Sequence, residues 1–192
     1  VDPEYMFTYG TINGKGLAMH ELRPTVIEAQ AAMKAGYGAA FESARGKPGA
    51  AEVYARIEAL PEKIGKVRQP GGEQLDLIGL YKGALGAVGE LWEYGQQAIV
   101  ASGEAGVAAS WGLKKAMRIW FKLTAKYRGD VSKVTDCARI SLEFATAEGL
   151  ERAATFVLQA ASTFKNRVAN PTDEGYRDLM FTVLIGGHVC EV

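Results

Sequence analysis

The stretch VTDCARISLEF, residues 134–144, is rich in β-branched residues and alternates in polarity, which is typical of a strand. The next stretch, AEGLERAATFVLQAAST (147–163), has helical spacing. A short edge-like strand, FKNRVANP (164–171), follows, and residues 176–192 then contain two apolar runs joined by Gly-Gly, which predicts a hairpin. Residues 129–192 are therefore predicted to form an α/β region with the order β, α, β, β, β.

The front half of the chain carries helical patterns instead. A helix is expected from Pro24, a second pattern at residues 50–60 breaks at Pro61, and a long pattern at residues 74–101 has apolar residues at helical spacing. We interpret these helices as a packed bundle without a catalytic role, since no stretch between residues 24 and 110 resembles a catalytic motif.

Three regions follow from this division. We expect an irregular N-terminal arm at residues 1–23, a helical region at 24–128 and the α/β region at 129–192. The expected fold class is α+β, with an N-terminal helical bundle packed on a small mixed β-sheet. Because the sequence opens without Met and ends inside an expected strand, we expect a processed or partial product.

Composition narrows the function classes. The chain has 192 residues, 48% of them hydrophobic, and a formal net charge of zero, so it can bury a core and does not favour nucleic acid or an anionic membrane as a whole-protein partner. No run of roughly 18 apolar residues occurs, so we expect no membrane span and a soluble or peripheral protein. Cys137 and Cys190 fit neither a disulfide framework nor a four-ligand zinc site, and we expect both to be inert core residues.

Four basic residues, Lys114, Arg118, Lys122 and Lys126, stand four apart in a stretch predicted to be helical. Such a stripe can cradle a polyphosphate, with Arg as a fork and Lys as a point charge. The alternative is a solvated helix face opposite the apolar packing face. The spacing alone does not decide between a polyphosphate site and a solvated helix face.

Two carboxylates stand among apolar residues of expected strands. Asp136 lies between Val134 and Ile140, and Glu191 is flanked by Cys190 and Val192. A carboxylate in such a place is costly without a cation or hydrogen-bond donors. If the two strands are neighbours, Asp136 and Glu191 can converge on Mg²⁺, as phosphoryl-transfer sites require.

The pieces LKKAMRIWFKLTAKYRGD, VTDCARI, FKNRVANPTDEGYRD and HVCEV, in this order, resemble the RelA/SpoT-like nucleotidyltransferase domain. The resemblance covers about residues 112–192 and leaves out the front half. It implies a mixed sheet flanked by helices. It also implies transfer of pyrophosphate from ATP to the 3′-hydroxyl of GDP or GTP, or a related nucleotidyl transfer.

The resemblance also implies roles for single residues. Asp136 matches the family's first metal-binding acid, so Mg²⁺ is the implied cofactor, and Glu191 matches the second acid, which helps to activate the acceptor hydroxyl. Arg118 and Lys122 match basic residues that hold the donor phosphates. Two further nucleotide-binding candidates are Arg139, which follows the first acid by three residues rather than five, and Tyr176, which matches the aromatic that stacks on the acceptor base.

The sequence departs from the family pattern at Met180, where the Gly-Tyr-x-x-x-His motif has its His. Met can neither donate nor accept a proton there, and the chain also ends at Val192, before the polar residues that follow in the family. We therefore expect transfer to be weak or lost. The alternative function is a non-catalytic accessory subunit of a larger assembly, with protein partners, in an organellar (plastid) or even photosynthetic setting. The Ala/Gly-rich helices and the aromatic-rich arm suit such packing.

Overall fold

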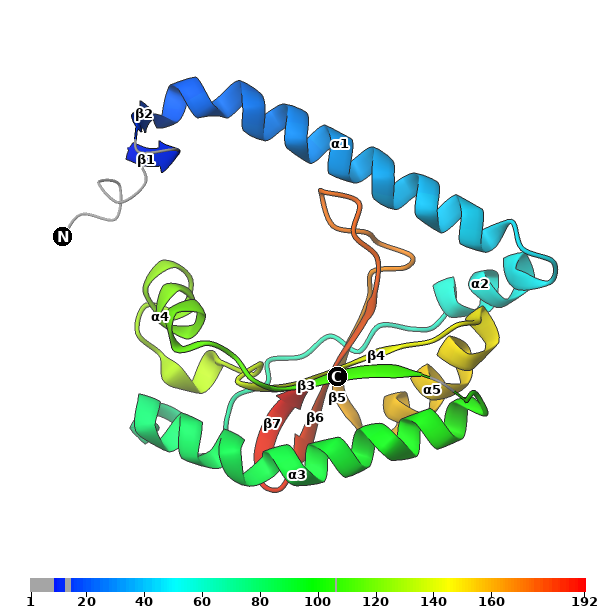
Figure 1. Cartoon of the computed structure of the whole chain (residues 1–192). Helices are drawn as coiled ribbons and strands as arrows, with labels where there is room; N and C mark the ends of the chain where they lie inside the picture. Colours follow the sequence, from blue (N-terminus) through cyan, green and yellow to red (C-terminus); the bar gives the residue numbers. More distant parts are fainter. Residues whose placement is uncertain (1–8, 13–14, 106) are drawn as a thin grey trace.

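The computed structural model describes residues 9–12, 15–105 and 107–192, and shows an α+β protein built on a five-stranded mixed sheet (Figure 1). The strands lie in the order β3-β4-β7-β6-β5; β4 and β7 are parallel, and the other neighbours are antiparallel. The strands are β3 (Ala108–Leu113), β4 (Ala138–Glu143), β5 (Ala161–Asn166), β6 (Leu179–Ile185) and β7 (His188–Glu191).

Helices cover one face of this sheet more completely than the other. The described helices are α1 (Met19–Arg45), α2 (Ala50–Glu58), α3 (Leu77–Ser102), α4 (Ala116–Ala125) and α5 (Ala147–Ala160). The helices α3 and α5 pack against one face and against each other, and they bury Leu80, Leu91 and Val157 with Ile140 of the sheet. We call the opposite face the open face; α4 and the long α1 lie on that side (Figure 1).

The order β, α, β, β, β predicted for residues 129–192 is confirmed as β4, α5, β5, β6 and β7. The hairpin between β6 and β7 turns at Gly186 and Gly187, whose φ angles of 56° and 72° explain why two glycines stand there. Thr146 caps the N-terminus of α5, since its hydroxyl accepts a hydrogen bond from the Gly149 amide at 3.0 Å.

The front half differs from the expectation in two ways. The strand β3 lies within residues 24–128, which were expected to be helical, and it forms an edge of the sheet beside β4. The helices of this half also form no bundle of their own, because α3 packs on the sheet and most described side chains of α1, from Ile27 onward, are exposed. The expectation of an N-terminal helical bundle is therefore wrong, because the sheet extends into the front half of the chain.

The N-terminal segment contains more regular structure than the irregular arm expected at residues 1–23. The strands β1 (Tyr9–Ile12) and β2 (Lys15–Ala18) pair antiparallel, and α1 begins at Met19, so that Pro24 lies inside the helix. Residues 1–8 and 13–14 of the expected arm lie outside the described residues. Among the described residues, none of the helices combines the length and apolar character that a membrane span requires.

Candidate functional site

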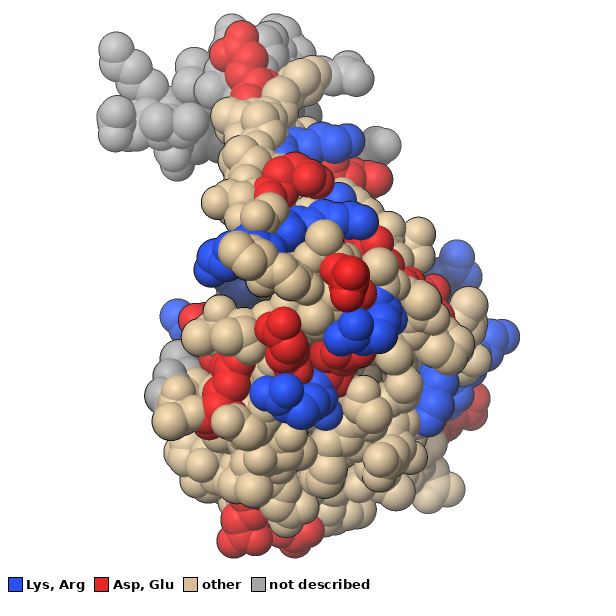
Figure 2. All heavy atoms as spheres, turned by 90° about the vertical axis from the view of Figure 1, so that its right-hand side faces the viewer, with Lys and Arg blue, Asp and Glu red and all other residues tan. Residues whose placement is uncertain are grey.

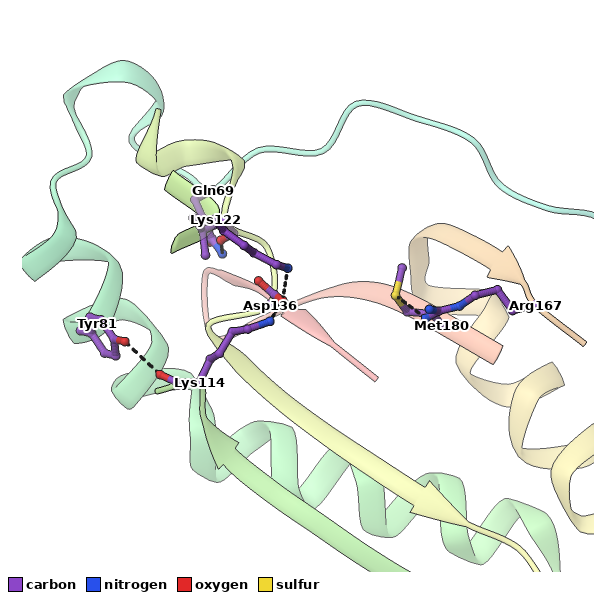
Figure 3. Close-up of polar contacts among 8 residues, drawn as sticks. Gln69, Tyr81, Lys114, Lys122, Asp136, Arg167 and Met180 are labelled. Carbon is purple, nitrogen blue, oxygen red and sulfur yellow. Dashed lines mark hydrogen bonds and ion pairs between the residues drawn. The ribbon is translucent and has the colours of Figure 1, made fainter. Parts of the chain in front are cut away.

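Asp136 is the centre of a buried ionic cluster on the open side of the sheet. Its residue is 4% exposed, and its Oδ2 accepts hydrogen bonds from the Nζ atoms of both Lys114 and Lys122, which converge on it (Figure 3). The Lys114 side chain is 10% exposed and that of Lys122 is 31% exposed. A buried carboxylate is therefore shared by two cations, one of which still reaches solvent.

Packing and backbone hydrogen bonds fix the two lysines. Lys114 follows β3, where its amide donates to the Cys137 carbonyl at 2.8 Å and its own carbonyl accepts from the Tyr81 hydroxyl at 2.9 Å. Lys122 lies on α4, which is anchored to the core by Ile119 and Leu123. The sheet edge, α3 and α4 together hold both ammonium groups against Asp136.

Two sequence-based expectations about this cluster need correction. Asp136 lies just before β4 and not within a strand, and Lys114 precedes α4, so the four basic residues do not share one helix stripe. Arg118 is exposed on α4 one turn before Lys122, and the Lys126 Nζ lies 5.6 Å from the centroid of the neighbouring Tyr127 ring. Lys114 and Lys122 therefore contact Asp136, whereas Arg118 and Lys126 form no described contact with it.

The pKa values of the cluster reflect burial and mutual charge. Burial alone would raise the pKa of Asp136, but hydrogen bonds from the two lysines outweigh it and hold the pKa below its usual value. Burial lowers the pKa of Lys114, and Asp136 opposes this shift. For Lys122 burial also acts to lower the pKa, but the hydrogen bond and charge of Asp136 raise it overall. Asp136 is thus held ionised.

Glu191 lies on the same face, in a polar row that crosses the sheet. It is paired with Arg139 of β4 and with Thr182 of β6, and directly opposed residues of neighbouring strands share a face. Burial raises the pKa of Glu191, and the charge of Asp136 raises it further, while Lys114 and Arg139 act in the opposite direction. The negative charge of Asp136 therefore acts on the carboxylate of Glu191.

The described carboxylates of this cluster are too few to hold a metal ion by themselves. Among the described residues there is no group of three or more His, Cys, Asp or Glu side chains that could hold a metal ion by itself. However, Oδ1 of Asp136 is buried and accepts no hydrogen bond within the described structure. Mg²⁺ is commonly held by one or two carboxylates together with water and substrate phosphates, and Oδ1 of Asp136 is the unpaired carboxylate oxygen of this cluster.

Tyr176 lies away from this cluster. Its ring packs edge-to-face on Tyr37 of α1 at 5.5 Å, and the Arg167 guanidinium lies 5.9 Å from its centroid. It is held there by a loop that rises from the sheet toward α1, where Gly175 lies against Lys34 (Figure 1). Tyr176 lines a cavity of about 650 Å³ beyond the end of β4, and neither Asp136 nor Glu191 lines that cavity.

The neighbours of Tyr176 are used structurally. Arg177 stacks on the Phe41 ring at 4.1 Å and donates to the Val168 carbonyl. Asp178 forms an ion pair with Arg167 at 2.6 Å, where Arg167 follows β5 and Asp178 precedes β6. Arg177 and Asp178 thus contact different partners and do not form one charged patch.

Met180 lies on β6 and contacts the same arginine. The Arg167 Nη2 is 3.0 Å from the Met180 Sδ (Figure 3). Met180, at the position for which the sequence resemblance implies histidine, thus carries a thioether that cannot transfer a proton.

The other candidates from the sequence are structural. Cys137 and Cys190 are buried, which confirms that they are core residues, and burial raises the pKa of each thiol to about 12. His188, the first residue of β7 after the hairpin turn, is buried. Its Nε2 lies 3.2 Å from the Nε2 of Gln69, and burial lowers its pKa. His20 lies among the residues whose side chains are not described.

The sequence interpretation missed a set of basic residues beside the cluster. A cavity of about 490 Å³ on the open face is lined by Lys66, Arg68, Lys133 and Lys165. Thr135, which precedes Asp136, and Thr182, which is paired with Glu191, also line it. The signal in the sequence was the cation-rich segment EKIGKVR (62–68), which follows Pro61 and lies in a region considered purely structural.

No protein-family model matches the chain, and no curated protein is recognisably similar to it in sequence.

Proposed function

We propose that the open face of the sheet binds a nucleoside triphosphate together with Mg²⁺ around Asp136, and that pyrophosphate transfer from ATP to GDP or GTP is weak or lost. One observation carries this proposal. Asp136 is buried with two lysines on one carboxylate oxygen, while its other oxygen is buried without a partner. A buried carboxylate oxygen without a partner is costly, so we assign a cation or a hydrogen-bond donor to Oδ1 of Asp136.

The charges of the cluster favour an anionic ligand. Lys114, Lys122 and Arg139 all act on the carboxylate of Glu191. The cationic side chains of the cluster outnumber its two carboxylates, so a bound divalent cation requires further negative charge. A triphosphate supplies that charge, and Mg²⁺ bound to it neutralises and orients the phosphate oxygens.

Each side chain then has a role of its own. Asp136 would hold the ion through Oδ1, and Lys114 keeps the carboxylate ionised and oriented. Lys122, which is partly exposed, contacts both Asp136 and the donor phosphates. Glu191 has a raised pKa, which suits a carboxylate that takes the proton of the acceptor hydroxyl.

Two features support weak or lost transfer. Met180 provides no proton-transferring group where the family has one. Tyr176 lines a separate cavity, so in this arrangement it does not place an acceptor base beside Glu191. Positioning and acid–base groups each contribute on the order of 10²-fold or more to rate, and their loss leaves binding with little turnover.

The test is incubation of the full chain with Mg²⁺, labelled ATP and GDP or GTP, followed by separation of pyrophosphorylated product. We expect ATP binding with trace or no product, and loss of any product in Glu191→Gln. Lys82→Ala, an exposed change on α3, is the matched control. Robust product would show that transfer is retained; absence of any nucleotide affinity would overturn the proposal.

The second candidate is the accessory subunit in a larger assembly. The observation that favours it is apolar exposure on the open side: Met117 and Trp120 of α4 are 77% and 59% exposed, and Ile27 and Met33 of α1 are exposed too. Large exposed apolar side chains of this kind mark protein interfaces. Met117→Ser with Trp120→Ser should weaken co-purification of partners and leave ATP binding unchanged. The organellar setting stays a prediction.

A further inference from the structure

Residues 62–69 form a strap that crosses the open side of the sheet and is fixed at one end to its edge. The Lys63 amide and carbonyl pair with the Phe164 carbonyl and amide at 3.2 and 3.0 Å, which adds a bridge beyond the edge strand β5. The Lys63 Nζ donates to the carbonyl of Leu158 at 2.6 Å, and Glu62 accepts from the Asn166 amide at 2.8 Å. This end of the strap is thus integral to the sheet.

The other end is fixed by Gln69, which is buried. Its amide donates to the Ser132 carbonyl at 2.7 Å, and its side chain donates to the carbonyls of Val134 and Val189 and accepts from the Val189 amide. Because backbone groups of the sheet hold both ends, the middle of the strap, Ile64–Arg68, has a defined place. Ile64 is 92% exposed, so no described element covers that middle.

The strap forms one wall of the cavity of about 490 Å³, and we call this cavity the strap pocket. Lys66 and Arg68 come from the strap, Lys133 comes from the turn before Asp136, and Lys165 comes from β5. Thr163 and Thr182, whose hydroxyls lie 2.5 Å apart, contribute hydroxyl groups. No Asp or Glu lines this pocket among the described residues.

The charges in the strap pocket are only partly compensated. Asp130, outside the lining, accepts from the Arg68 Nη1 at 2.6 Å and forms an ion pair with the Lys133 Nζ at 3.2 Å. Neither Lys66 nor Lys165 forms an ion pair with a described residue. Like charges around one cavity repel one another, and a bound anion removes that repulsion.

On the flank of α2 and α5, in contrast to the strap pocket, acidic and basic side chains are interspersed (Figure 2). There Arg56 pairs with Glu151 at 2.7 Å and Arg45 with Glu58 at 2.9 Å. The cations on this flank are thus compensated by neighbouring carboxylates. The strap pocket differs because its cations converge on a cavity without acids.

We propose that the strap pocket binds a diphosphate group, either as inorganic pyrophosphate or as part of a nucleoside diphosphate. Its volume exceeds what a single phosphate fills and lies in the range of small-molecule sites. Arg68, held in place by Asp130, supplies a guanidinium fork, and Lys66 and Lys165 supply point charges. Two of these three cations belong to the strap, outside the segment that resembles a known family, and the inference does not rest on nucleotide chemistry at Asp136.

The position of the pocket gives the ligand a defined neighbour. Thr135 precedes Asp136 and Thr182 is paired with Glu191, so a diphosphate in the strap pocket lies beside the ionic cluster. A second phosphate-bearing molecule can therefore be held next to a triphosphate at Asp136, with the strap as the part that recognises it.

Calorimetric titration of the full chain with sodium pyrophosphate, GDP and guanosine tests this. We expect pyrophosphate or GDP to bind and guanosine not to bind. Lys66→Ala and Lys165→Ala should each weaken binding of the phosphate compounds about tenfold or more, since each removes a charge-assisted contact. A tighter binding of GDP than of pyrophosphate would identify the nucleotide as the source of the diphosphate, and the reverse order would identify the inorganic ion.

Two controls separate this inference from the function proposed around Asp136. Lys82→Ala removes an exposed lysine on α3 and should leave the affinity unchanged. Lys66→Ala and Lys165→Ala should keep the Mg²⁺-dependent affinity for ATP, so that failure at Asp136 and failure at the strap give different results. Lack of affinity for both phosphate compounds, or wild-type affinity in both lysine variants, would overturn the proposal. Lys66 and Lys165 are exposed, and thermal melts should show that both variants are folded.

Discussion

Arg139 on β4 and Glu191 on β7 are paired residues across the parallel junction of the sheet, so their side chains leave the sheet on the same face. This pairing joins the strand that follows Asp136 to the last strand of the chain. The half-buried carboxylate of Glu191 therefore lies in a field set by Asp136, Lys114, Lys122 and Arg139. The pKa of Glu191 therefore depends on the positions of these four side chains.

Asp136→Asn should lower the pKa of Glu191. The substitution removes a negative charge that raises this pKa, and it leaves the positive charges of the lysines uncompensated, so both effects have the same sign. The carboxyl carbon of Glu191 can be followed by NMR during a pH titration of both proteins. An unchanged or higher pKa in the variant would contradict the placement of Glu191 beside Asp136.

The same substitution should destabilise the fold. Loss of the Asp136 charge leaves Lys114 buried without its counter-ion, and breaking a buried ion pair in this way costs about 3–5 kcal/mol. Arg118→Ala, on the exposed surface of α4, should change the free energy of unfolding by less than about 0.5 kcal/mol. Urea unfolding of both variants gives this comparison; equal stability of the two would show that the cluster contributes no net stability.

His188 should make stability depend on pH. Burial lowers its pKa in the folded protein, whereas the unfolded chain binds the proton with a pKa of about 6.5. The unfolded state therefore takes up more protons, and this contribution to stability is present above pH 6.5 and lost as the pH falls below it. Urea unfolding between pH 7.5 and 5 should show a slope that is smaller in His188→Gln. An identical slope would exclude His188 as its source.

Two glycines of α3 offer a matched test of packing. A Cβ at Gly83 would lie 2.9 Å from the Nδ1 of His188, whereas a Cβ at Gly86 meets no atom within 4 Å. Gly83→Ala should cost about 1–3 kcal/mol through overpacking, and Gly86→Ala should add up to about 1 kcal/mol through helix propensity. Thermal melts that rank the two variants in the opposite order would show that α3 does not lie against β7 as described.

Local patterns predicted the C-terminal half of the fold because its strands alternate in polarity and its hairpin turns on Gly186 and Gly187. They missed β3 because its sequence, AASWGL, is short, rich in small residues and adjacent to a basic stretch with helical spacing. This omission also placed Lys114 on a helix. Its contact with Asp136 depends on the pairing of β3 with β4, which is a tertiary feature.

The sequence predicted a part of the candidate site only where a charged residue stood among apolar neighbours and therefore required a partner. Asp136 among apolar neighbours was such a place, and two cations are found on it. The strap was not predictable, because Lys66 and Arg68 lie about 100 residues before Lys165 in the sequence and reach the same cavity only through the backbone bridge of Lys63 with Phe164. For Tyr176 the sequence motif predicted a place beside the cluster, but the structure places its ring against Tyr37 of α1. A motif in the sequence does not reveal this tertiary contact.

The most direct measurement is the calorimetric affinity of the full chain for ATP with and without Mg²⁺. We predict tighter binding with Mg²⁺, a loss of affinity of at least about tenfold in Lys122→Ala, whose side chain is partly exposed, and no change in Lys82→Ala. Asp136→Asn should abolish the advantage given by Mg²⁺. A wild-type chain that binds no ATP, or a Lys122→Ala chain that binds it as tightly as wild type, would contradict a nucleotide site at Asp136.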